Sequence, residues 1–252
     1  MPFHVVIPAR HASSRLPGKP LLPLAGRPMV EHVWRRACES GAEEVVIATD
    51  HEGIAETAAA FGAEVCMTAA DHPSGTDRLS EVVALRGWSD ERIVVNLQGD
   101  EPLMPPALVR QVAEDLHGHA DAVITTLCTP ISSRDELFDP HAVKVVRDER
   151  GYALYFSRAP IPWDRDRFAG GGEALAVDAH FRHVGIYAYR AGFLRHYAEL
   201  PPSDLERLES LEQLRVLSAG YPIHVSVTAT PPGHGVDTRE DVERVERLLG
   251  GG

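Results

Sequence analysis

The clearest sign of chemistry in this sequence is a basic stretch near the amino terminus, PARHASSRLPGKPL, at residues 8–21. Before the first acidic residue, Glu31, the chain carries four cationic residues: Arg10, Arg15, Lys19 and Arg27. Arg15 and Lys19 stand on either side of a Pro-Gly pair and could close together on a polyphosphate. Arginine would supply forked hydrogen bonds and lysine a compact point charge. The stretch therefore predicts a binding loop for an anion.

A solvated connection rich in proline and glycine is the alternative interpretation of this stretch. Its composition weakens that alternative, because Ser13 and Ser14 add hydroxyl and amide donors to the cations. The stretch does not match a Walker A loop, since Ser13 occupies the place of the first glycine and Pro20 that of the Ser or Thr. A kinase or ATPase is thereby disfavoured.

Two aspartates supply the second chemical signal. Asp100 follows VVNLQG, at the end of a predicted buried strand, where a carboxylate needs a partner or a cation. Asp237 lies in GHGVDT, after another predicted strand. Each could alone support a helix start, before Pro105 and beside Thr238 respectively. Because Mg²⁺ is typically held by one or two carboxylates plus substrate phosphates, the pair and the basic loop together predict a magnesium site.

A third, weaker signal is HPSGTDR, at residues 72–78, which reads as a loop turning into a helix. Ser74 or Thr76 would cap this helix, and Asp77 would lie in its first turn. The exposed amides of such a start could contact the edge of a base. The same pattern is also typical of an ordinary helix start.

Strands and helices alternate along the first half of the chain. Short apolar runs rich in β-branched residues predict strands buried on both faces, at 3–7, 45–49, 63–67, 93–97 and 122–127. Helical spacing and helix-start signals predict the intervening helices, at 29–40, 53–61, 77–86 and 106–117. This alternation predicts an α/β fold, with a mostly parallel sheet covered by helices on both sides.

The pattern changes after about residue 140. VKVVRDERGYALYF places two strand-like runs around a turn-prone stretch, which predicts a hairpin added to the sheet. The later elements are a polar loop at 164–178, a strand at 180–189, helices near 191–199 and 204–219, a strand at 223–228 and a helix from about 238. In such sheets ligands bind beyond the carboxyl ends of the strands. Because the basic loop and both aspartates follow strands, we expect them in one cleft.

Composition limits the partners. Asp and Glu outnumber Lys and Arg by 37 to 25, so the field of the chain repels nucleic acid and anionic membranes. The apolar run in MPFHVVIPAR is too short for a signal peptide, and no run of about 18 apolar residues predicts a membrane span. Three cysteines without a C-x-x-C pair predict neither disulfides nor a zinc knuckle. We expect a cytoplasmic protein with small-molecule substrates.

A series of segments resembles one enzyme family. These segments are PARHASSRLPGKPL, ATDHE, SGTDR, VVNLQGDEP, YFSRAPIPWDRD, HVGIYAYR, LEQLRVL and GVDT, which extend from residue 8 to residue 238. Together they resemble the 3-deoxy-manno-octulosonate cytidylyltransferases, the CMP-Kdo synthetases of Gram-negative bacteria. Because the match covers nearly the whole chain, its specificity is high.

The resemblance implies an activity and an architecture. Members of the family transfer CMP from CTP to the anomeric hydroxyl of Kdo, an eight-carbon sugar acid, and release pyrophosphate in a magnesium-dependent reaction of lipopolysaccharide synthesis. The resemblance also implies a homodimer and a Rossmann-like three-layer sandwich of the nucleotide-diphospho-sugar transferase type. We expect one nucleotidyltransferase domain over residues 1–252, with sugar-site and dimerisation elements within about 140–230.

The resemblance further implies the residues of the site. The CTP phosphates would be held by Arg10, Ser14, Arg15 and Lys19. The cytosine and ribose would lie near Ala9, Ser74, Gly75 and Thr76. Magnesium would be held by Asp100 and Asp237. The sugar acid would be surrounded by Gln98, Arg158, His183, Tyr187, Glu212 and Gln213. The catalytic residues would be Arg15, Lys19, Asp100 and Asp237.

Strand and helix geometry agrees with part of the sugar site. Alternate side chains of a strand share a face, so His183 and Tyr187 can line one pocket. On a helix over 204–219, the spacing places Glu209, Glu212 and Gln213 on one surface. An apolar flank of the same helix would comprise Leu205, Leu208, Leu211 and Val216. Without the resemblance, the polar residues of this helix and Arg158 could equally be solvated.

Two other functions remain open at this point. A CMP-sialate synthetase shares the chemistry and a related opening loop, but it differs in its sugar-site residues, and the R-L-P-G-K-P run favours Kdo. A catalytically silent nucleotide-binding module on the same fold is the alternative from another class. The presence of both candidate metal carboxylates weighs against that second alternative.

Overall fold

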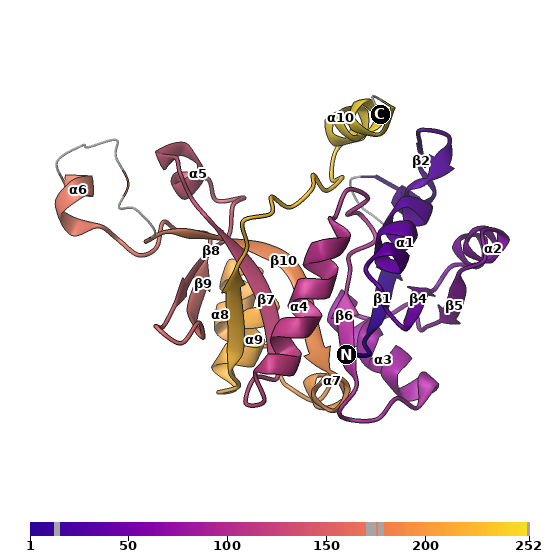
Figure 1. The fold of residues 1–252 in the computed structure, drawn as a ribbon, viewed down its shortest axis with the longest axis horizontal. Helices are drawn as coiled ribbons and strands as arrows, with labels where there is room; N and C mark the ends of the chain where they lie inside the picture. The colour runs from indigo at the N-terminus through magenta and orange to yellow at the C-terminus, as the bar shows by residue number, and fades with distance from the viewer. Residues whose placement is uncertain (13–15, 170–174, 176–178, 251–252) are drawn as a thin grey trace.

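The computed structural model describes residues 1–12, 16–169, 175 and 179–250. Among these residues, nine strands form one sheet (Figure 1). Seven of the strands lie side by side, in an order along the sheet that differs from their order in the chain, and we call this row the main path. That path is β11 (Ile223–Val227), β7 (Ile124–Pro130), β10 (Phe181–Arg190), β6 (Ile93–Asn96), β1 (His4–Ala9), β4 (Glu44–Thr49) and β5 (Glu64–Met67). The predicted apolar strands all form, and every residue of β1 and β6 is buried. Burial on both faces explains their continuous apolar pattern.

Most of the path is parallel, as the alternation of elements predicts. β1 pairs in parallel with β4 and β6, and β11 pairs in parallel with β7. β10 is the exception, since it runs antiparallel between β6 and β7. The predicted hairpin is present as β8 (Lys144–Arg147) and β9 (Ala153–Ser157), and β8 also pairs with one end of β10. The predicted α/β fold class is thus confirmed.

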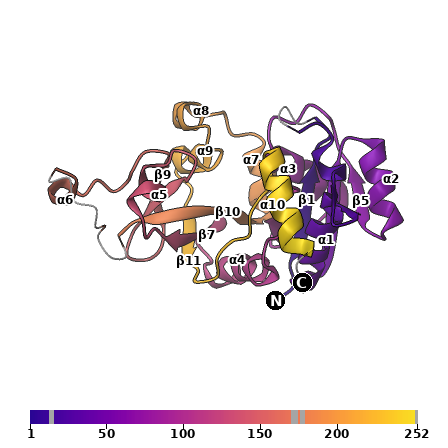
Figure 2. The same ribbon diagram turned by 90° about the horizontal axis from the view of Figure 1, so that it is seen from above.

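Helices cover both faces of the sheet and give three layers (Figure 2). One face packs against α1 (Met29–Glu39), α2 (Glu52–Ala60) and α4 (Pro106–Gly118). The other face packs against α3 (Gly75–Arg86), α7 (Ala191–Tyr197) and α9 (Gln213–Ser218). No helix of the described residues is both long and apolar enough to cross a lipid bilayer.

The prediction of one continuous helix over 204–219 is wrong, because the structure has two separate helices there. Ser210 adopts a left-handed conformation with φ 52°, which ends α8 (Asp204–Glu209) and lets α9 start in a new direction. Glu209 therefore does not share a surface with Glu212. The predicted apolar flank is divided as well: Leu211 and Val216 are buried, whereas Leu208 is 82% exposed.

The carboxyl-terminal segment returns to the amino-terminal half of the molecule. A small apolar cluster joins α10 (Arg239–Gly250) to the short strand β2 (Pro23–Leu24) and the start of α1, through Leu24, Met29 and Val245 among others, and β2 pairs with β3 (Arg27–Pro28). The segment before α10 crosses above the sheet to reach this position (Figure 1). At the other end of the molecule, α5 (Arg134–Phe138) and α6 (Arg165–Ala169) form a separate small cluster.

Candidate active site

Lys19, Asp100 and Asp237 lie together beyond the carboxyl ends of β1 and β6. The Lys19 Nζ atom lies 2.6 Å from Asp100 Oδ2, 3.1 Å from Asp237 Oδ1 and 2.8 Å from the backbone oxygen of Val236. Residues separated by more than two hundred positions thus meet around one ammonium group. Lys19 begins the single turn η1 (Lys19–Leu21), which follows Gly18 in a left-handed conformation.

Two glycines let the loop that carries Asp237 approach the loop that carries Asp100. The backbone N–H of Val236 donates a 2.9 Å hydrogen bond to the Asp100 carbonyl oxygen. A Cβ atom on Gly233 would lie 2.2 Å from the Leu103 carbonyl oxygen, and one on Gly235 would lie 2.9 Å from the Glu101 carboxyl group. A side chain at residue 233 would collide with this backbone oxygen, so Gly233 allows the two loops to approach each other.

Glu101 lies directly behind the two aspartates. Burial, and then the charges of Asp100 and Asp237, raise the pKa of the Glu101 carboxyl group to about 8. Its Oε2 atom is buried and has no hydrogen-bond partner among the described residues. Near neutral pH the Glu101 carboxyl group is therefore mostly protonated. The negative charge of the cluster then comes from the two aspartates.

These residues border a cavity of about 530 Å³, here called the aspartate pocket. Its lining comprises Pro8, Arg10, Ala12, Lys19, Pro20, Gly75, Gln98, Gly99, Asp100, Glu212 and Asp237. The described cations of the lining, Arg10 and Lys19, face three carboxylates, so this part of the pocket is not electropositive. Ser14 and Arg15, which the sequence also assigns to anion binding, lie outside the described residues.

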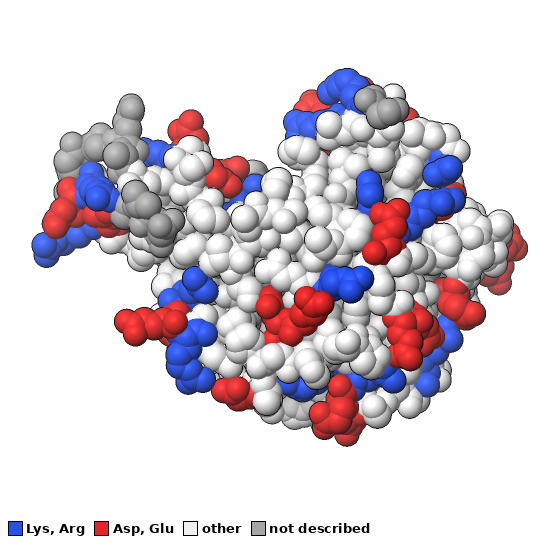
Figure 3. All heavy atoms as spheres, viewed as in Figure 1, with Lys and Arg blue, Asp and Glu red and all other residues white. Residues whose placement is uncertain are grey.

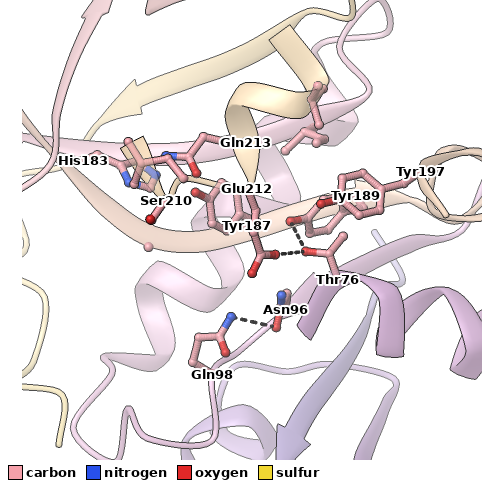
Figure 4. Close-up of a pocket in the computed structure, with 14 residues that line it drawn as sticks. Thr76, Asn96, Gln98, His183, Tyr187, Tyr189, Tyr197, Ser210, Glu212 and Gln213 are labelled. Carbon is pink, nitrogen blue, oxygen red and sulfur yellow. Dashed lines mark hydrogen bonds between the residues drawn. The ribbon is translucent and has the colours of Figure 1, made fainter. Parts of the chain in front are cut away.

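A second cavity of about 280 Å³ adjoins the first and is called here the tyrosine pocket (Figure 4). Five of the six residues expected around the sugar acid line it: Gln98, His183, Tyr187, Glu212 and Gln213. Four further polar residues of its wall were not assigned to the site from the sequence: Asn96, Tyr189, Tyr197 and Ser210. Gln98 and Glu212 line both pockets and therefore mark the place where the two cavities meet.

A bulge in β10 shapes one wall of the tyrosine pocket. Val184 pairs with Leu127 and Tyr187 with the next residue, Thr126, so β10 holds two extra residues at this point. An even number of extra residues preserves the alternation of side chains, and His183 and Tyr187 still face the same cavity. The Thr126 hydroxyl lies within hydrogen-bond distance of the carbonyl oxygens of Val184 (3.1 Å) and Ile186 (2.7 Å).

Burial keeps the groups of this wall uncharged. Desolvation, with a smaller contribution from Arg182, lowers the pKa of His183 to about 3. Desolvation likewise raises the pKa of the Tyr187 and Tyr189 hydroxyls. The wall therefore offers neutral hydrogen-bonding groups at physiological pH, which suits a ligand rich in hydroxyl groups.

Glu212 is the acidic group at the junction of the two pockets. It reaches from the start of α9 toward the start of α3, where Thr76 Oγ1 donates a 3.0 Å hydrogen bond to its Oε2 atom (Figure 4). Burial is the largest cause of the raised pKa of Glu212, whereas the Thr76 hydrogen bond and the charge of Arg10 act in the opposite direction. The side chain thus joins the two sides of the cleft.

The amino-terminal end of α3 lies between the pockets. Ser74 caps this helix, because its hydroxyl accepts a hydrogen bond from the Asp77 N–H and donates one to the Asp77 carboxylate. Gly75 borders the aspartate pocket and Thr76 the tyrosine pocket. Ala9, at the end of β1, is buried and lines neither pocket.

Arg158 also lines neither pocket. Its guanidinium donates hydrogen bonds to the carbonyl oxygens of Glu209 (2.7 Å) and Pro140 (3.0 Å), and the Glu209 carboxylate accepts from the Arg158 backbone N–H. These contacts hold the turn between α8 and α9. Because Ser210 and the next residues of that turn line the tyrosine pocket, Arg158 supports the pocket from behind in this structure.

Comparisons with known proteins agree with this arrangement. A family model described as "Cytidylyltransferase" matches residues 4–226. A protein of Serratia proteamaculans named 3-deoxy-manno-octulosonate cytidylyltransferase is 58% identical over 251 residues, which is 100% of both chains. A protein of Halorhodospira halophila with the same name is 60% identical and covers 98% of this chain and 96% of its own.

Solved structures are similar as well. The structure of a CMP:2-keto-3-deoxy-manno-octonic acid synthetase complexed with CTP is 44% identical, with a TM-score of 0.89 over 100% of this chain and 99% of the other. A cytidylyltransferase of Leptospira borgpetersenii shares the fold, with a TM-score of 0.64 at 17% identity over 100% of this chain and 88% of the other.

Proposed function

This chain belongs to the 3-deoxy-manno-octulosonate cytidylyltransferase family, and we propose that it transfers CMP from CTP to the anomeric hydroxyl of Kdo and releases pyrophosphate. The observation that carries the proposal is the junction of two pockets of different chemistry at Gln98 and Glu212. A transfer between two substrates requires two adjoining sites, with the reacting atoms at the place where they meet.

The character of each pocket supports one substrate. The aspartate pocket, with Arg10 and Lys19 in its wall and two aspartates that could hold a divalent cation, suits the triphosphate of CTP bound together with such a cation. The tyrosine pocket, with neutral hydrogen-bonding groups from β10, suits the hydroxyl groups of Kdo. A pocket of about 280 Å³ is of the right order for a sugar of eight carbons.

The aspartate pocket also fits a magnesium ion. Asp100, Asp237 and the Val236 carbonyl oxygen converge on one point, where a cationic group of the protein itself lies. Among the described residues no group of three or more His, Cys, Asp or Glu side chains is arranged to hold a metal. Such an ion would take its remaining ligands from phosphate oxygens and water, as magnesium usually does. When bound, it would neutralise charge on the triphosphate.

The mechanism that we propose is an in-line displacement. The anomeric hydroxyl of Kdo gives its proton to solvent water as its oxygen forms a bond to the α-phosphorus of CTP. The bond between the α-phosphorus and the bridging oxygen breaks, and pyrophosphate leaves with the electron pair. Gln98 and Glu212 would position the attacking group at the junction, while Arg10, Arg15 and Lys19 would offset the repulsion between the two anionic substrates. Alignment and charge neutralisation would supply most of the rate enhancement.

We propose a homodimer, with the exposed face of α8 against a second copy of the chain. The support is that α8 has no buried residue and presents Leu205 and Leu208, the latter 82% exposed. We further propose a cytoplasmic enzyme of lipopolysaccharide synthesis, because CTP is a cytoplasmic metabolite and Kdo is a component of that polymer.

A product assay with two sugar acids tests the proposed function. The protein is incubated with CTP, Mg²⁺ and either Kdo or N-acetylneuraminate, and pyrophosphate release is followed together with the CMP-sugar product. We expect release with Kdo and at least about a hundredfold lower kcat/KM with the sialate, because a ligand that leaves buried polar groups unpaired is strongly disfavoured. Preference for the sialate would show the alternative synthetase, and binding of CTP without release in either mixture would show a silent module.

A further inference from the structure

Lys19 occupies the point on which the two aspartates converge. Its Nζ atom carries three hydrogens, and three protein oxygens lie at 2.6, 2.8 and 3.1 Å from it. The side chain is only 13% exposed, although it borders a cavity. The hydrogen-bonding capacity of this ammonium group is therefore satisfied by the Val236 carbonyl oxygen and by the same two carboxylates that would hold a divalent ion.

The residue type supports a specific role for a compact charge at this position. The sequence contains only two lysines, Lys19 and Lys144, among 25 basic residues. Both place the ammonium group among backbone or carboxylate oxygens, since Lys144 donates to the carbonyl oxygens of Asp139 and Arg158. An arginine presents a flat fork of donors rather than a point charge. A chain that otherwise uses arginine thus has lysine where a small cation fits.

A divalent ion and this ammonium group cannot occupy the same point. Two cations a few ångströms apart repel one another, and the carboxylate oxygens that one uses are lost to the other. The aspartate pocket gives Lys19 an alternative position, because its flexible stem borders a cavity of about 530 Å³ that suits phosphate oxygens. Departure of the ammonium group from the carboxylates is therefore feasible when an anion arrives.

We infer that Lys19 competes with the divalent ion for Asp100 and Asp237, and that the nucleotide resolves this competition by drawing the ammonium group onto its phosphates. This inference rests on the proposed function, because it takes a nucleotide triphosphate as the incoming anion. It goes beyond that function by assigning an order of events. A free divalent ion binds weakly, and ion and nucleotide each strengthen the binding of the other through the position of one side chain.

Titration with Mn²⁺, followed by the electron paramagnetic resonance signal of the free ion, tests the competition without turnover. Wild-type protein, Lys19→Met and Arg239→Met are titrated in the absence of nucleotide. Arg239 is exposed and lies two residues from Asp237, so the second variant removes a nearby charge on the protein surface. We expect Lys19→Met to bind Mn²⁺ at least about tenfold more tightly than wild type, and Arg239→Met to change the affinity less than about twofold.

The second part of the titration is carried out in the presence of a nucleotide. A non-hydrolysable CTP analogue is expected to tighten Mn²⁺ binding to wild type by a larger factor than Mn²⁺ binding to Lys19→Met, because the variant has no competitor to displace. Mn²⁺ binding to Lys19→Met that is no tighter than to wild type overturns the inference, and so does an equal enhancement in both proteins. Circular dichroism confirms that each variant is folded.

An NMR measurement on the wild-type protein observes Lys19 directly. It tests the inference even if the variant does not fold. With only two lysines, a spectrum of ¹⁵N-lysine ammonium groups contains two signals. We expect the Lys19 signal to shift when Mg²⁺ and the CTP analogue are added together, and the Lys144 signal to stay. A complex that forms without moving the Lys19 signal contradicts the inference. Failure of the analogue to bind contradicts the proposed function instead.

Discussion

Burial determines the protonation of single side chains in the cleft. Desolvation raises the pKa of Glu101 to about 8 and lowers that of His183 to about 3, so both groups are mostly uncharged near pH 7. The acidic groups of the aspartate pocket are Asp100, Asp237 and Glu212, and burial raises the pKa of Glu212. Charge in this cleft is thus confined to the place where a triphosphate and its cation would bind.

Replacement of Asp100 by asparagine tests the cation site. Asp100→Asn preserves shape but removes one of the two negative charges around the Lys19 ammonium group. We expect kcat to fall by about a hundredfold or more, with a smaller effect on CTP binding measured by calorimetry. Asp121→Asn is the matched control, since Asp121 is exposed, pairs with Arg150 and lines neither the aspartate pocket nor the tyrosine pocket. A turnover of Asp100→Asn close to that of wild type would remove Asp100 from the mechanism.

His224 predicts how the folded state responds to acid. Its ring stacks on His119 at a centroid distance of 3.6 Å, and burial, with the charges of His119 and Arg147, lowers its pKa to about 4. As the pH falls from about 6.5 to about 4, the unfolded chain binds this proton first, so the folded state loses stability through that window. His224→Phe keeps a stacked ring but removes the titration.

The comparison is made by urea unfolding at pH 7 and pH 5. Between pH 7 and pH 5, we expect the free energy of unfolding to decrease in both proteins. The decrease should be about 1–2 kcal/mol smaller in His224→Phe than in wild type. His196→Phe serves as the control, because this histidine is partly exposed. The same loss in His224→Phe and wild type would show that His224 is not held neutral by the fold.

Some residues of the site could be predicted from the sequence, and others could not. The types and positions of Lys19, Asp100 and Asp237 after strand ends predict a cluster, since strand ends meet at one edge of a sheet. Asn96 stands two residues before Gln98 in an apolar strand, a signal that could have assigned it to the same face. Tyr197 lies on α7, and nothing in its local sequence predicts that it reaches a pocket formed by β10 and α9.

At the scale of elements, the bulge in β10 depends on one hydroxyl group. Thr126→Val removes the group that contacts two carbonyl oxygens of the bulge and the His183 ring, but keeps the shape of the side chain. We expect a loss of about 1–3 kcal/mol in the free energy of unfolding, because buried acceptors are left unpaired. We also expect a raised KM for the sugar acid, because the bulge presents His183 and Tyr187 to the pocket.

A neighbouring threonine provides the control. Thr125 is equally buried, and its hydroxyl bonds the carbonyl oxygen of Val112 in α4, on the other side of the sheet. Thr125→Val should therefore lower stability by a similar amount but leave the KM for the sugar acid unchanged. Equal effects of the two substitutions on KM would show that the bulge does not control the tyrosine pocket.

The elements themselves were largely predictable, with one instructive exception. Apolar runs of four to six residues between helical stretches are typical of buried parallel strands, and β1 and β6 are examples. The break at Ser210 has no local signal, because LERLESLEQLRVL contains neither glycine nor proline. The contacts that hold this turn come from a residue distant in sequence, because Arg158 donates hydrogen bonds to the carbonyl oxygens of Glu209 and Pro140.

At the scale of the whole molecule, the net charge is −12. Figure 3 shows acidic and basic side chains interspersed on the face that it presents, without a continuous basic area. A nucleic-acid-binding protein would need such an area. Binding of small anions is therefore a local property of the cleft, and it relies on single cations rather than on the field of the molecule.

The association state is tested by light scattering after gel filtration. We expect a mass of about twice the 27.5 kDa of one chain. Leu208→Glu places a charge on the exposed face of α8 and should increase the fraction of monomer. Leu85→Glu, at a leucine of α3 that is 60% exposed, should not. A monomeric wild type would contradict the homodimer, and equal behaviour of both variants would exclude α8 from its interface.

The central claim is that the two pockets meet where the anomeric oxygen of a sugar acid attacks the α-phosphorus of CTP. The most direct measurement is ³¹P NMR of the product formed from CTP and Kdo in H₂¹⁸O, in which the anomeric oxygen of Kdo has exchanged with solvent. The account predicts CMP-Kdo with ¹⁸O in the bridge between phosphorus and sugar, together with unlabelled pyrophosphate. CMP-Kdo with ¹⁶O in that bridge, or ¹⁸O in the pyrophosphate, would contradict it.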